Sequence, residues 1–185
     1  PGEKNLVGRG VAYCATCDGM FYKGKTVAVV GGGNSAASEA LVLSRIAKKV
    51  YLIHRRDTFR GEPVMVEKLR GMDNVEMVLG YQVKELLGGE NLSGIRLEDA
   101  SGQSKDLVVD GVFVAIGHSP ANEAFREWIE LDEKGYADAG EDCVTKTPGI
   151  FVAGDNRKKT IRQLTTAAAD GAVAALAACQ FLDQN

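Results

Sequence analysis

A β-branched run that leads directly into three glycines constrains this chain more than any other feature of its sequence. Residues 25–30 (KTVAVV) predict a buried strand, and residues 34–47 have the spacing of small and apolar side chains that favours a helix. Residues 50–53 (VYLI) predict a second buried strand. Strand, glycine turn, helix and strand make a β-α-β unit, which is typical of a parallel, doubly wound sheet. We therefore expect an α/β, Rossmann-like fold.

The glycine turn has the Gly-x-Gly-x-x-Ala form of a dinucleotide-binding loop. Gly31 would allow the tight turn, Gly33 the close approach of a pyrophosphate, and Ala36 the close packing of helix on sheet. Free N–H groups at the start of the helix would face the phosphates. An ordinary strand-to-helix turn is the alternative, although the strand before the glycines and the helix after them favour the binding loop.

Basic residues follow the second predicted strand, where a NAD-binding protein usually carries an acid against the ribose hydroxyls. His54, Arg55 and Arg56 are consecutive there, and Arg60 follows closely. Guanidinium groups pair with phosphate through two hydrogen bonds, so the cluster favours a 2′-phosphate and hence NADPH. The alternative is a solvated basic face.

Further along the chain the pattern changes twice. One more helix and strand are followed by three alternating segments typical of an antiparallel meander, and then by another strand. These elements are expected at residues 61–70, 75–79, 81–87, 92–98, 105–109 and 111–116. A more polar stretch then predicts a short helix, a buried strand and a long Ala-rich helix, at residues 123–129, 150–153 and 161–182. A domain boundary is expected near residue 120.

Cys14 and Cys17 are the sharpest chemical signal. They lie in the segment Cys-Ala-Thr-Cys-Asp-Gly, and two thiols at this spacing can close a disulfide at the start of a helical turn. A structural zinc site is the main alternative, and it needs two more ligands. No second paired spacing exists among the remaining candidates, which are His54, His118, Cys143 and Cys179. We therefore expect no metal.

Two other groups of residues carry weaker signals. Asp18 adjoins Cys17 and could move a proton when a disulfide is reduced, although a turn aspartate is the plainer interpretation. Gly154 and Asp155 close a predicted strand, and the start of the last helix could stabilise negative charge on a reduced flavin. From composition alone, these last residues are a capped strand end followed by a packing helix.

Charge and hydropathy exclude several classes of partner. The net charge of −3 provides no basic field for nucleic acid or an anionic membrane surface. No apolar run approaches the roughly 20 residues needed to cross a bilayer, and the opening residues lack the apolar core of a signal peptide. Four widely spread cysteines do not make a disulfide-rich secreted scaffold. We expect a soluble cytoplasmic protein.

Taken together, five segments resemble the successive signatures of the low-molecular-weight, bacterial-type thioredoxin reductases. In order, they are GRGVAYCATCDG, VVGGGNSA, HRRDTFR, DGVFVAIGHSPAN and FVAGDNRKKTIRQLTTAAADG. The resemblance implies a flavoprotein oxidoreductase that passes electrons from NADPH through FAD and a redox disulfide to thioredoxin. It implies that Cys17 faces the flavin, that Cys14 attacks the substrate disulfide, and that Asp18 is the acid–base residue.

The same resemblance assigns the cofactor contacts. Those to NADPH are expected from Gly32, Gly33, Asn34, Ser35 and Ala36 at the pyrophosphate, and from His54, Arg55, Arg56 and Arg60 at the 2′-phosphate. Ile116 and Gly117 are further expected cofactor contacts. Those to FAD are expected from Gly154 and Asp155 at the ribityl chain and pyrophosphate, and from Arg162, Gln163 and Ala167 at the ring edge. Asn34 stands where the family more usually has an acid, and an amide can still accept and donate hydrogen bonds there.

The chain departs from the family at its front, because the adenine-binding Gly-x-Gly-x-x-Gly stretch is absent from this sequence. We therefore expect a fragment, with an NADPH-binding domain over residues 1–120 and the C-terminal portion of a discontinuous FAD-binding domain over residues 121–185. Such a fragment should bind FAD weakly or not at all, and the full-length enzyme would be a homodimer. Two alternatives stay open: a flavoprotein reductase of a peroxidase dithiol domain, and a non-catalytic NADPH-binding module.

Overall fold

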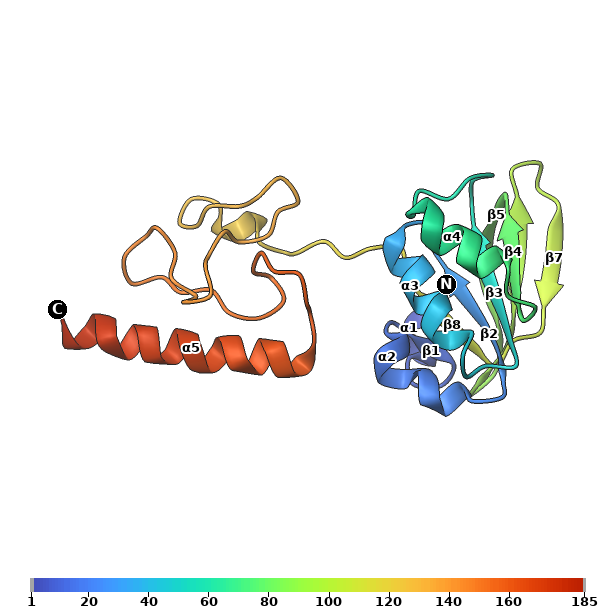
Figure 1. The fold of residues 1–185 in the computed structure, drawn as a ribbon, viewed down its shortest axis with the longest axis horizontal. Helices are drawn as coiled ribbons and strands as arrows, with labels where there is room; N and C mark the ends of the chain where they lie inside the picture. Colours follow the sequence, from blue (N-terminus) through green and yellow to red (C-terminus); the bar gives the residue numbers. More distant parts are fainter. Residues whose placement is uncertain (1, 185) are drawn as a thin grey trace. The chain divides into compact units, whose positions relative to one another are not determined.

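The computed structural model describes residues 2–184, and the chain separates after Gly117 into two compact units. The first unit is built on a five-stranded parallel sheet with the order β1-β8-β2-β3-β4 (Figure 1). Its strands are β1 (Val11–Ala12), β2 (Thr26–Val30), β3 (Lys49–His54), β4 (Val75–Leu79) and β8 (Gly111–Val114). The predicted parallel sheet is therefore confirmed.

Helices cover one face of this sheet (Figure 1). They are α2 (Ala15–Asp18), the 3-10 turn η1 (Gly19–Tyr22), α3 (Asn34–Leu43) and α4 (Pro63–Arg70). Val27 and Val29 of β2 point into the core beneath them, because side chains alternate along a strand. Ala40 and Leu43 of α3 are fully buried against these valines. Small residues on α3 thus bring the helix close to the strands that carry the glycine turn.

An antiparallel sheet covers the opposite face, with the order β5-β6-β7. Its strands are β5 (Tyr81–Gly88), β6 (Leu92–Asp99) and β7 (Ser104–Leu107), which confirms the predicted meander. Ala28 and Ile53 of the parallel sheet meet Ile95 and Leu97 of β6 in a second core. The short helix α1 (Glu3–Leu6) adds Leu6 to it.

The predicted helix over residues 34–47 was too long at its end, because α3 stops at Leu43. Ser44 donates its hydroxyl to the Leu41 carbonyl, and the next backbone bonds are of the tighter 3-10 kind. The Lys48 N–H then reaches the Lys25 carbonyl at 2.8 Å. The chain has to leave the helix here so that β3 can align with β2.

The second unit has little regular structure, as the polar sequence indicated. It contains the 3-10 turn η2 (Glu123–Phe125) and the long helix α5 (Leu164–Asp183), around a small core that includes Ile129 and Val152. The predicted helix over residues 123–129 was wrong beyond its first turn, and the predicted strand over residues 150–153 was wrong. Phe151 makes only an isolated bridge to Val144, because no described segment of this unit extends the pairing into a ladder.

Helix α5 is also the one helix in residues 2–184 that length and mean hydropathy would allow to cross a membrane. The most apolar 18-residue window of this 20-residue helix has a mean hydropathy of 1.3, so the expectation that no segment approaches a membrane span is not confirmed. Length and composition do not distinguish such a span from an Ala-rich packing helix. Only 6% of its apolar window is buried, and Asp170, which pairs with Arg157 and Lys159, is the one buried residue of α5.

Candidate functional site

Cys14 and Cys17 form a disulfide in the first unit, with their Cα atoms 5.3 Å apart. Cys14 is the N-cap of α2 and has extended backbone, so its sulfur folds back over the first turn and accepts the Cys17 N–H at 3.1 Å. Cys14 is half-buried and Cys17 is exposed. The helical turn therefore holds both sulfurs at the surface of the unit, where a second disulfide can reach them.

Residues from three elements surround this turn. Asp18 ends α2 and is half-buried. The pKa of Tyr22 in η1 is raised, first by burial of Tyr22 and then by the negative charge of the Asp18 carboxylate. Glu39 reaches over from α3, and its carboxylate accepts a hydrogen bond from the backbone N–H of Ala15. Sequence reasoning identified Asp18 from its place beside Cys17. It missed Glu39, because nothing in the sequence shows that the middle of α3 packs on α2.

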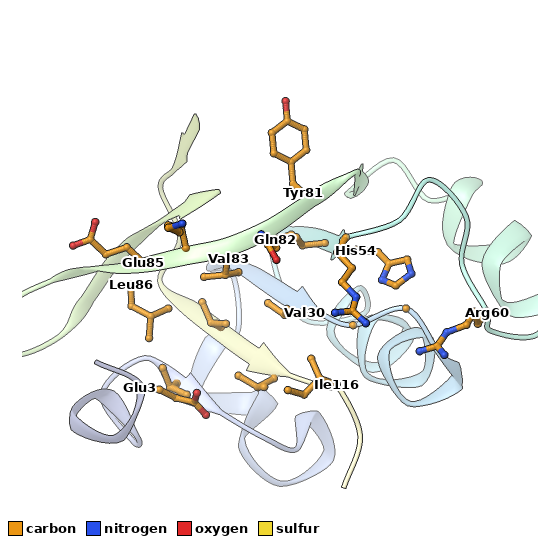
Figure 2. Close-up of a pocket in the computed structure, with 18 residues that line it drawn as sticks. Glu3, Val30, His54, Arg60, Tyr81, Gln82, Val83, Glu85, Leu86 and Ile116 are labelled. Carbon is orange, nitrogen blue, oxygen red and sulfur yellow. The ribbon is translucent and has the colours of Figure 1, made fainter. Parts of the chain in front are cut away.

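A pocket of about 540 Å³ opens where β2, β3 and β8 end, on the side of the sheet that faces β5 (Figure 2). In a parallel sheet the carboxyl ends of the strands are where ligands bind. Several residues expected to contact a cofactor line the pocket, namely Gly32, His54, Arg55, Arg60 and Ile116. Figure 2 shows His54 and Arg60 toward one end of it, and Glu3, Glu85 and Leu86 toward the other.

Two positions of the loop require glycine, because neighbouring atoms approach their Cα atoms too closely for a side chain. A Cβ on Gly32 would lie 2.1 Å from Cε1 of His54, and a Cβ on Gly31 would lie 2.3 Å from the carbonyl oxygen of Ala115. Both distances are far inside van der Waals contact. The loop after β2 can therefore lie flat against the end of β3 only because these positions have no side chain.

His54 is the most informative residue of the pocket. It is 6% exposed, it stacks on Phe59 with ring centroids 5.4 Å apart, and it makes a backbone hydrogen bond with Thr58. Its Nε2 is buried and has no hydrogen-bond partner among the described residues. Burial, followed by the charges of Arg60, Arg56 and Arg55, lowers the pKa of His54. Buried polar atoms usually have a hydrogen-bond partner, so the unsatisfied Nε2 makes His54 a candidate binding residue.

Three arginines lie close enough to His54 for their charges to act on its ring. Arg55, Arg56 and Arg60 are all exposed, and within residues 2–184 none of them is engaged in an ion pair. Like charges this close in sequence repel one another, and a phosphate would relieve the repulsion. The structure brings Arg55 and Arg60 to the pocket itself, while Arg56 lies outside its lining.

Other residues assigned to the nucleotide lie outside the pocket lining: Gly33, Asn34, Ser35, Ala36 and Gly117. Ala36 is buried in the core beneath the loop. Asn34 binds Glu62 at the start of α4: its amide group donates to the carboxylate at 3.3 Å, and its oxygen accepts the Glu62 N–H at 2.7 Å. Asn34 therefore ties the loop to α4 through both ends of its amide.

Strand β5 supplies a wall of the pocket that sequence reasoning missed. Gln82, Lys84 and Glu85 line it together with apolar neighbours on the same strand. The alternation of β5 predicted a strand, but only the packing of one sheet on the other shows that this strand flanks the glycine loop. No sequence signal would have identified these residues.

In the second unit, the turn at Gly154 is held by a buried carboxylate. Asp170 accepts the Gly154 N–H at 3.0 Å, the guanidinium of Arg157 at 3.0 and 3.1 Å, and the Lys159 ammonium at 2.9 Å. The Arg157 guanidinium, acting first among these partners, holds the pKa of Asp170 far below its usual range. Gly154 has a φ of +85°, which favours glycine.

The residues expected to contact FAD lie together in this unit. Arg162 donates from Nε to the Asp155 carbonyl at 3.1 Å, and its guanidinium lies 3.9 Å from the centroid of the Tyr136 ring. Gln163 caps α5 through a capping box, and Ala167 lies one turn further on, where its Cβ approaches Gly154. Sequence reasoning missed Arg157, Lys159 and Asp170, although an aspartate inside an Ala-rich helix is a signal for a buried pair.

Comparison with known proteins places this arrangement in a family. A family model described as pyridine nucleotide-disulphide oxidoreductase matches residues 1–171. Thioredoxin reductases of Coxiella burnetii and Mycolicibacterium smegmatis are 45% and 43% identical to the chain, over 99% and 100% of its length and 60% of theirs. The crystal structure of the Streptococcus pyogenes thioredoxin reductase matches with a TM-score of 0.89 and 37% identity, over 96% of this chain and 58% of that one. The chain thus spans about 60% of the length of these relatives. It belongs to the pyridine nucleotide-disulphide oxidoreductase family.

Proposed function

We propose that this chain is part of an NADPH-dependent thioredoxin-disulfide reductase and supplies its nucleotide site and its redox disulfide. One observation carries the proposal: the Cys14–Cys17 disulfide lies in the same compact unit as a pocket bordered by exposed arginines at the strand ends. The thioredoxin reductases with which the chain shares more than 40% identity support the same assignment. We assign residues 1–120 to the NADPH-binding domain and residues 121–185 to part of an FAD-binding domain.

The pocket residues fit a phosphorylated dinucleotide. Helix α3 begins directly after the glycine loop, so its first free N–H groups would bind the pyrophosphate. Arg55 and Arg60 would pair with the 2′-phosphate, with Arg56 adding to the field. The buried Nε2 of His54 would gain a hydrogen-bond partner on the nucleotide. An acidic residue in place of these arginines would favour NAD instead.

The redox step transfers two electrons. NADPH and one proton, together with the Cys14–Cys17 bond, yield NADP⁺ and two thiols, and the two sulfurs then pass the electron pair to a substrate disulfide by thiol exchange. A bound flavin would carry the electron pair between the nicotinamide and the disulfide. Asp18, half-buried beside Cys17, would exchange the proton at the leaving thiolate. Cys14 would attack the substrate disulfide.

The second unit would contribute contacts to that flavin. Gly154 and Asp155 form a glycine turn whose Gly154 N–H is fixed by Asp170, and Arg162 and Gln163 lie at the start of α5 beside it. Ala167 has the small side chain that a ring edge needs for close approach. We place the whole enzyme in the cytoplasm, with thioredoxin as its partner and a homodimer as its assembly.

Nucleotide titration tests the cofactor assignment. Arg55→Ala combined with Arg60→Ala removes the two arginines that line the pocket, so NADPH affinity should fall about 100-fold, at roughly 1.5 kcal/mol for each lost charged hydrogen bond. Affinity for NADH should hardly change. Arg70→Ala is the matched control, since Arg70 is an exposed arginine on α4 paired with Glu67. Unchanged NADPH affinity in the double variant, or a wild-type preference for NADH, would contradict the assignment.

The partner can be tested without flavin. The chain is reduced with dithiothreitol, freed of the reductant, and mixed with oxidised thioredoxin or with the oxidised dithiol domain of a peroxidase system. Faster transfer to thioredoxin supports the proposal, and faster transfer to the peroxidase domain supports the alternative reductase. Binding of NADPH with transfer to neither partner would favour a non-catalytic module.

A further inference from the structure

Glu39 is a charged residue that the proposed function does not use. It lies in the middle of α3, and α3 packs on the short redox helix α2. Its carboxylate accepts the backbone N–H of Ala15, the residue that directly follows Cys14. The side chain is half-buried, and the bond spans 24 residues of sequence. A carboxylate from the nucleotide-loop helix is thus fixed on the first turn of the redox helix.

Covalent geometry limits how far this charge can be from the Cys14 sulfur. The nitrogen of Ala15 is separated from Sγ of Cys14 by four bonds, so the hydrogen-bonded carboxylate lies at most about 7 Å from that sulfur. Two unit charges at this separation shift each other's pKa by roughly 0.5 to 2 units, for effective dielectric constants between 80 and 20. The effect is large enough to measure.

Besides Glu39, few ionisable groups lie on or next to the redox helix: Tyr13 directly precedes Cys14 and donates its hydroxyl to Glu3 of α1. On α2 itself Asp18 is the ionisable residue besides the cysteines, and on η1, which packs against α2, it is Tyr22. Helix α3 contains no ionisable residue other than Glu39. The Cys17 N–H already points at the Cys14 sulfur and would stabilise a thiolate there. Glu39 opposes this, because it occupies the neighbouring Ala15 N–H and adds a negative charge.

We propose that Glu39 is a positioning residue of the redox centre, which fixes the first turn of α2 and disfavours the thiolate of Cys14 in the reduced pair. This inference rests on the proposed redox function of Cys14 and Cys17. Reduction of their disulfide takes two electrons and two protons to give two thiols, or two electrons and one proton to give a thiol and a thiolate. Glu39 would keep the first outcome dominant to a higher pH and so make the dithiol a stronger reductant in alkaline solution.

Glu39→Gln tests the inference, because the amide oxygen can still accept the Ala15 N–H while the charge is lost. Glu76→Gln is the control: Glu76 lies on β4, at the edge of the sheet opposite β1, and pairs with Lys49 of β3. The rate of Cys14 alkylation by iodoacetamide is followed against pH in the reduced whole chain, and peptide mass spectrometry separates Cys14 from Cys143 and Cys179. The midpoint should fall by about 0.5 to 1 unit in Glu39→Gln and stay unchanged in Glu76→Gln.

Equilibration with dithiothreitol provides a second readout that a purely structural role would not produce. At pH 6 the thiols are protonated in both proteins, so the ratio of dithiol to disulfide should be the same. At pH 9 the ratio should rise roughly three- to eightfold in Glu39→Gln, given a thiol reference pKa near 8.5. A lower thiol pKa stabilises the reduced form only at pH values above that pKa. The ratio of dithiol to disulfide should therefore rise, and not fall, in Glu39→Gln at pH 9.

The outcomes separate this inference from the proposed function. Coincident pH profiles for wild type and Glu39→Gln, or a shift of equal size at pH 6 and pH 9, would overturn the role of Glu39. A wild-type pair that does not cycle between disulfide and dithiol would instead overturn the proposed redox function.

Discussion

Substitution of Gly32 by alanine tests whether His54 and the glycine loop form one fitted unit. The added Cβ would lie 2.1 to 2.3 Å from three atoms of the His54 ring. Carbon contacts settle at about 3.5 to 4.0 Å, so the ring would have to retreat by more than about 1 Å. Phe59 stacks on that ring and leaves it little room to do so. Overpacking of this kind costs about 1 to 3 kcal/mol, so Gly32→Ala should destabilise the first unit by that amount.

A double-mutant cycle separates this clash from a general effect of alanine in the loop. In a His54→Ala background the ring is gone, so Gly32→Ala should cost close to nothing there, and the coupling should be about 1 to 3 kcal/mol. Gly33→Ala is the matched control, because a Cβ at Gly33 meets no atom within 4 Å and its φ of −107° is open to any residue. It should change stability by less than about 0.5 kcal/mol.

Urea unfolding measures these differences unit by unit. Far-UV circular dichroism reports on both units, because the described strands of both sheets lie in the first unit and the long helix α5 lies in the second. The loss that belongs to the first unit is the part of this signal that tryptophan fluorescence does not follow. The chain has a single tryptophan, Trp128, in the second unit, so its fluorescence reports on that unit alone and should not move. An equal cost of Gly32→Ala with and without His54 would refute the fit between ring and loop, as would a Gly33→Ala penalty of the same size.

Three further predictions follow from buried or paired groups. Asp170→Asn breaks a buried pair and should lower the stability of the second unit, followed by Trp128 fluorescence, by about 3 to 5 kcal/mol. Because the pKa of Asp170 is depressed in the fold, the stability difference from wild type should hold above the unfolded pKa near 3.9 and shrink as pH falls below it. A stability difference that does not change with pH would contradict this. The pKa of His54 is lowered in the fold, so the first unit should lose stability as pH falls below about 6.5, and His54→Gln should remove that dependence in circular dichroism. Asn34→Asp should destabilise the first unit by about 1 kcal/mol near neutral pH, because it sets a second carboxylate against Glu62; Glu62→Gln should restore the loss, and no rescue would rule out this pairing.

Local patterns were sufficient to predict most of the first unit. Residues 75–79 form β4 over the bounds expected, and the turn segments GGEN and DASGQ separate β5, β6 and β7 as they should. Each of these elements has its own periodicity and its own turn chemistry, so the sequence holds the information locally. Residues 150–153 are as apolar as these strands, yet they do not form a strand. A strand needs a partner along its length, and that requirement is invisible in a single segment.

The site was predictable where its chemistry depends on spacing along the chain. Cys14 and Cys17 close a disulfide three residues apart, and Gly32 and His54 lie at the ends of adjacent strands. Contacts between elements were not predictable. In the sequence Glu39 is one of several polar residues on α3, and only the structure shows its contact with the redox helix. Asn34 was expected to contact phosphate, whereas in the structure its amide group binds Glu62 at the start of α4.

His54 and Asp170 show how a buried polar residue that binds a ligand differs from one that holds the fold. Asp170 has its oxygens filled by the Gly154 N–H, Arg157 and Lys159, and all of these partners lie in its own unit. A ligand could gain nothing from it without breaking those bonds, so its contribution is to stability. His54 is equally buried, but its Nε2 has no partner among the described residues and the ring borders a pocket. An unpartnered buried nitrogen costs free energy that a hydrogen-bond partner would offset. Under the proposed function, the nucleotide would supply that partner in the pocket beside His54.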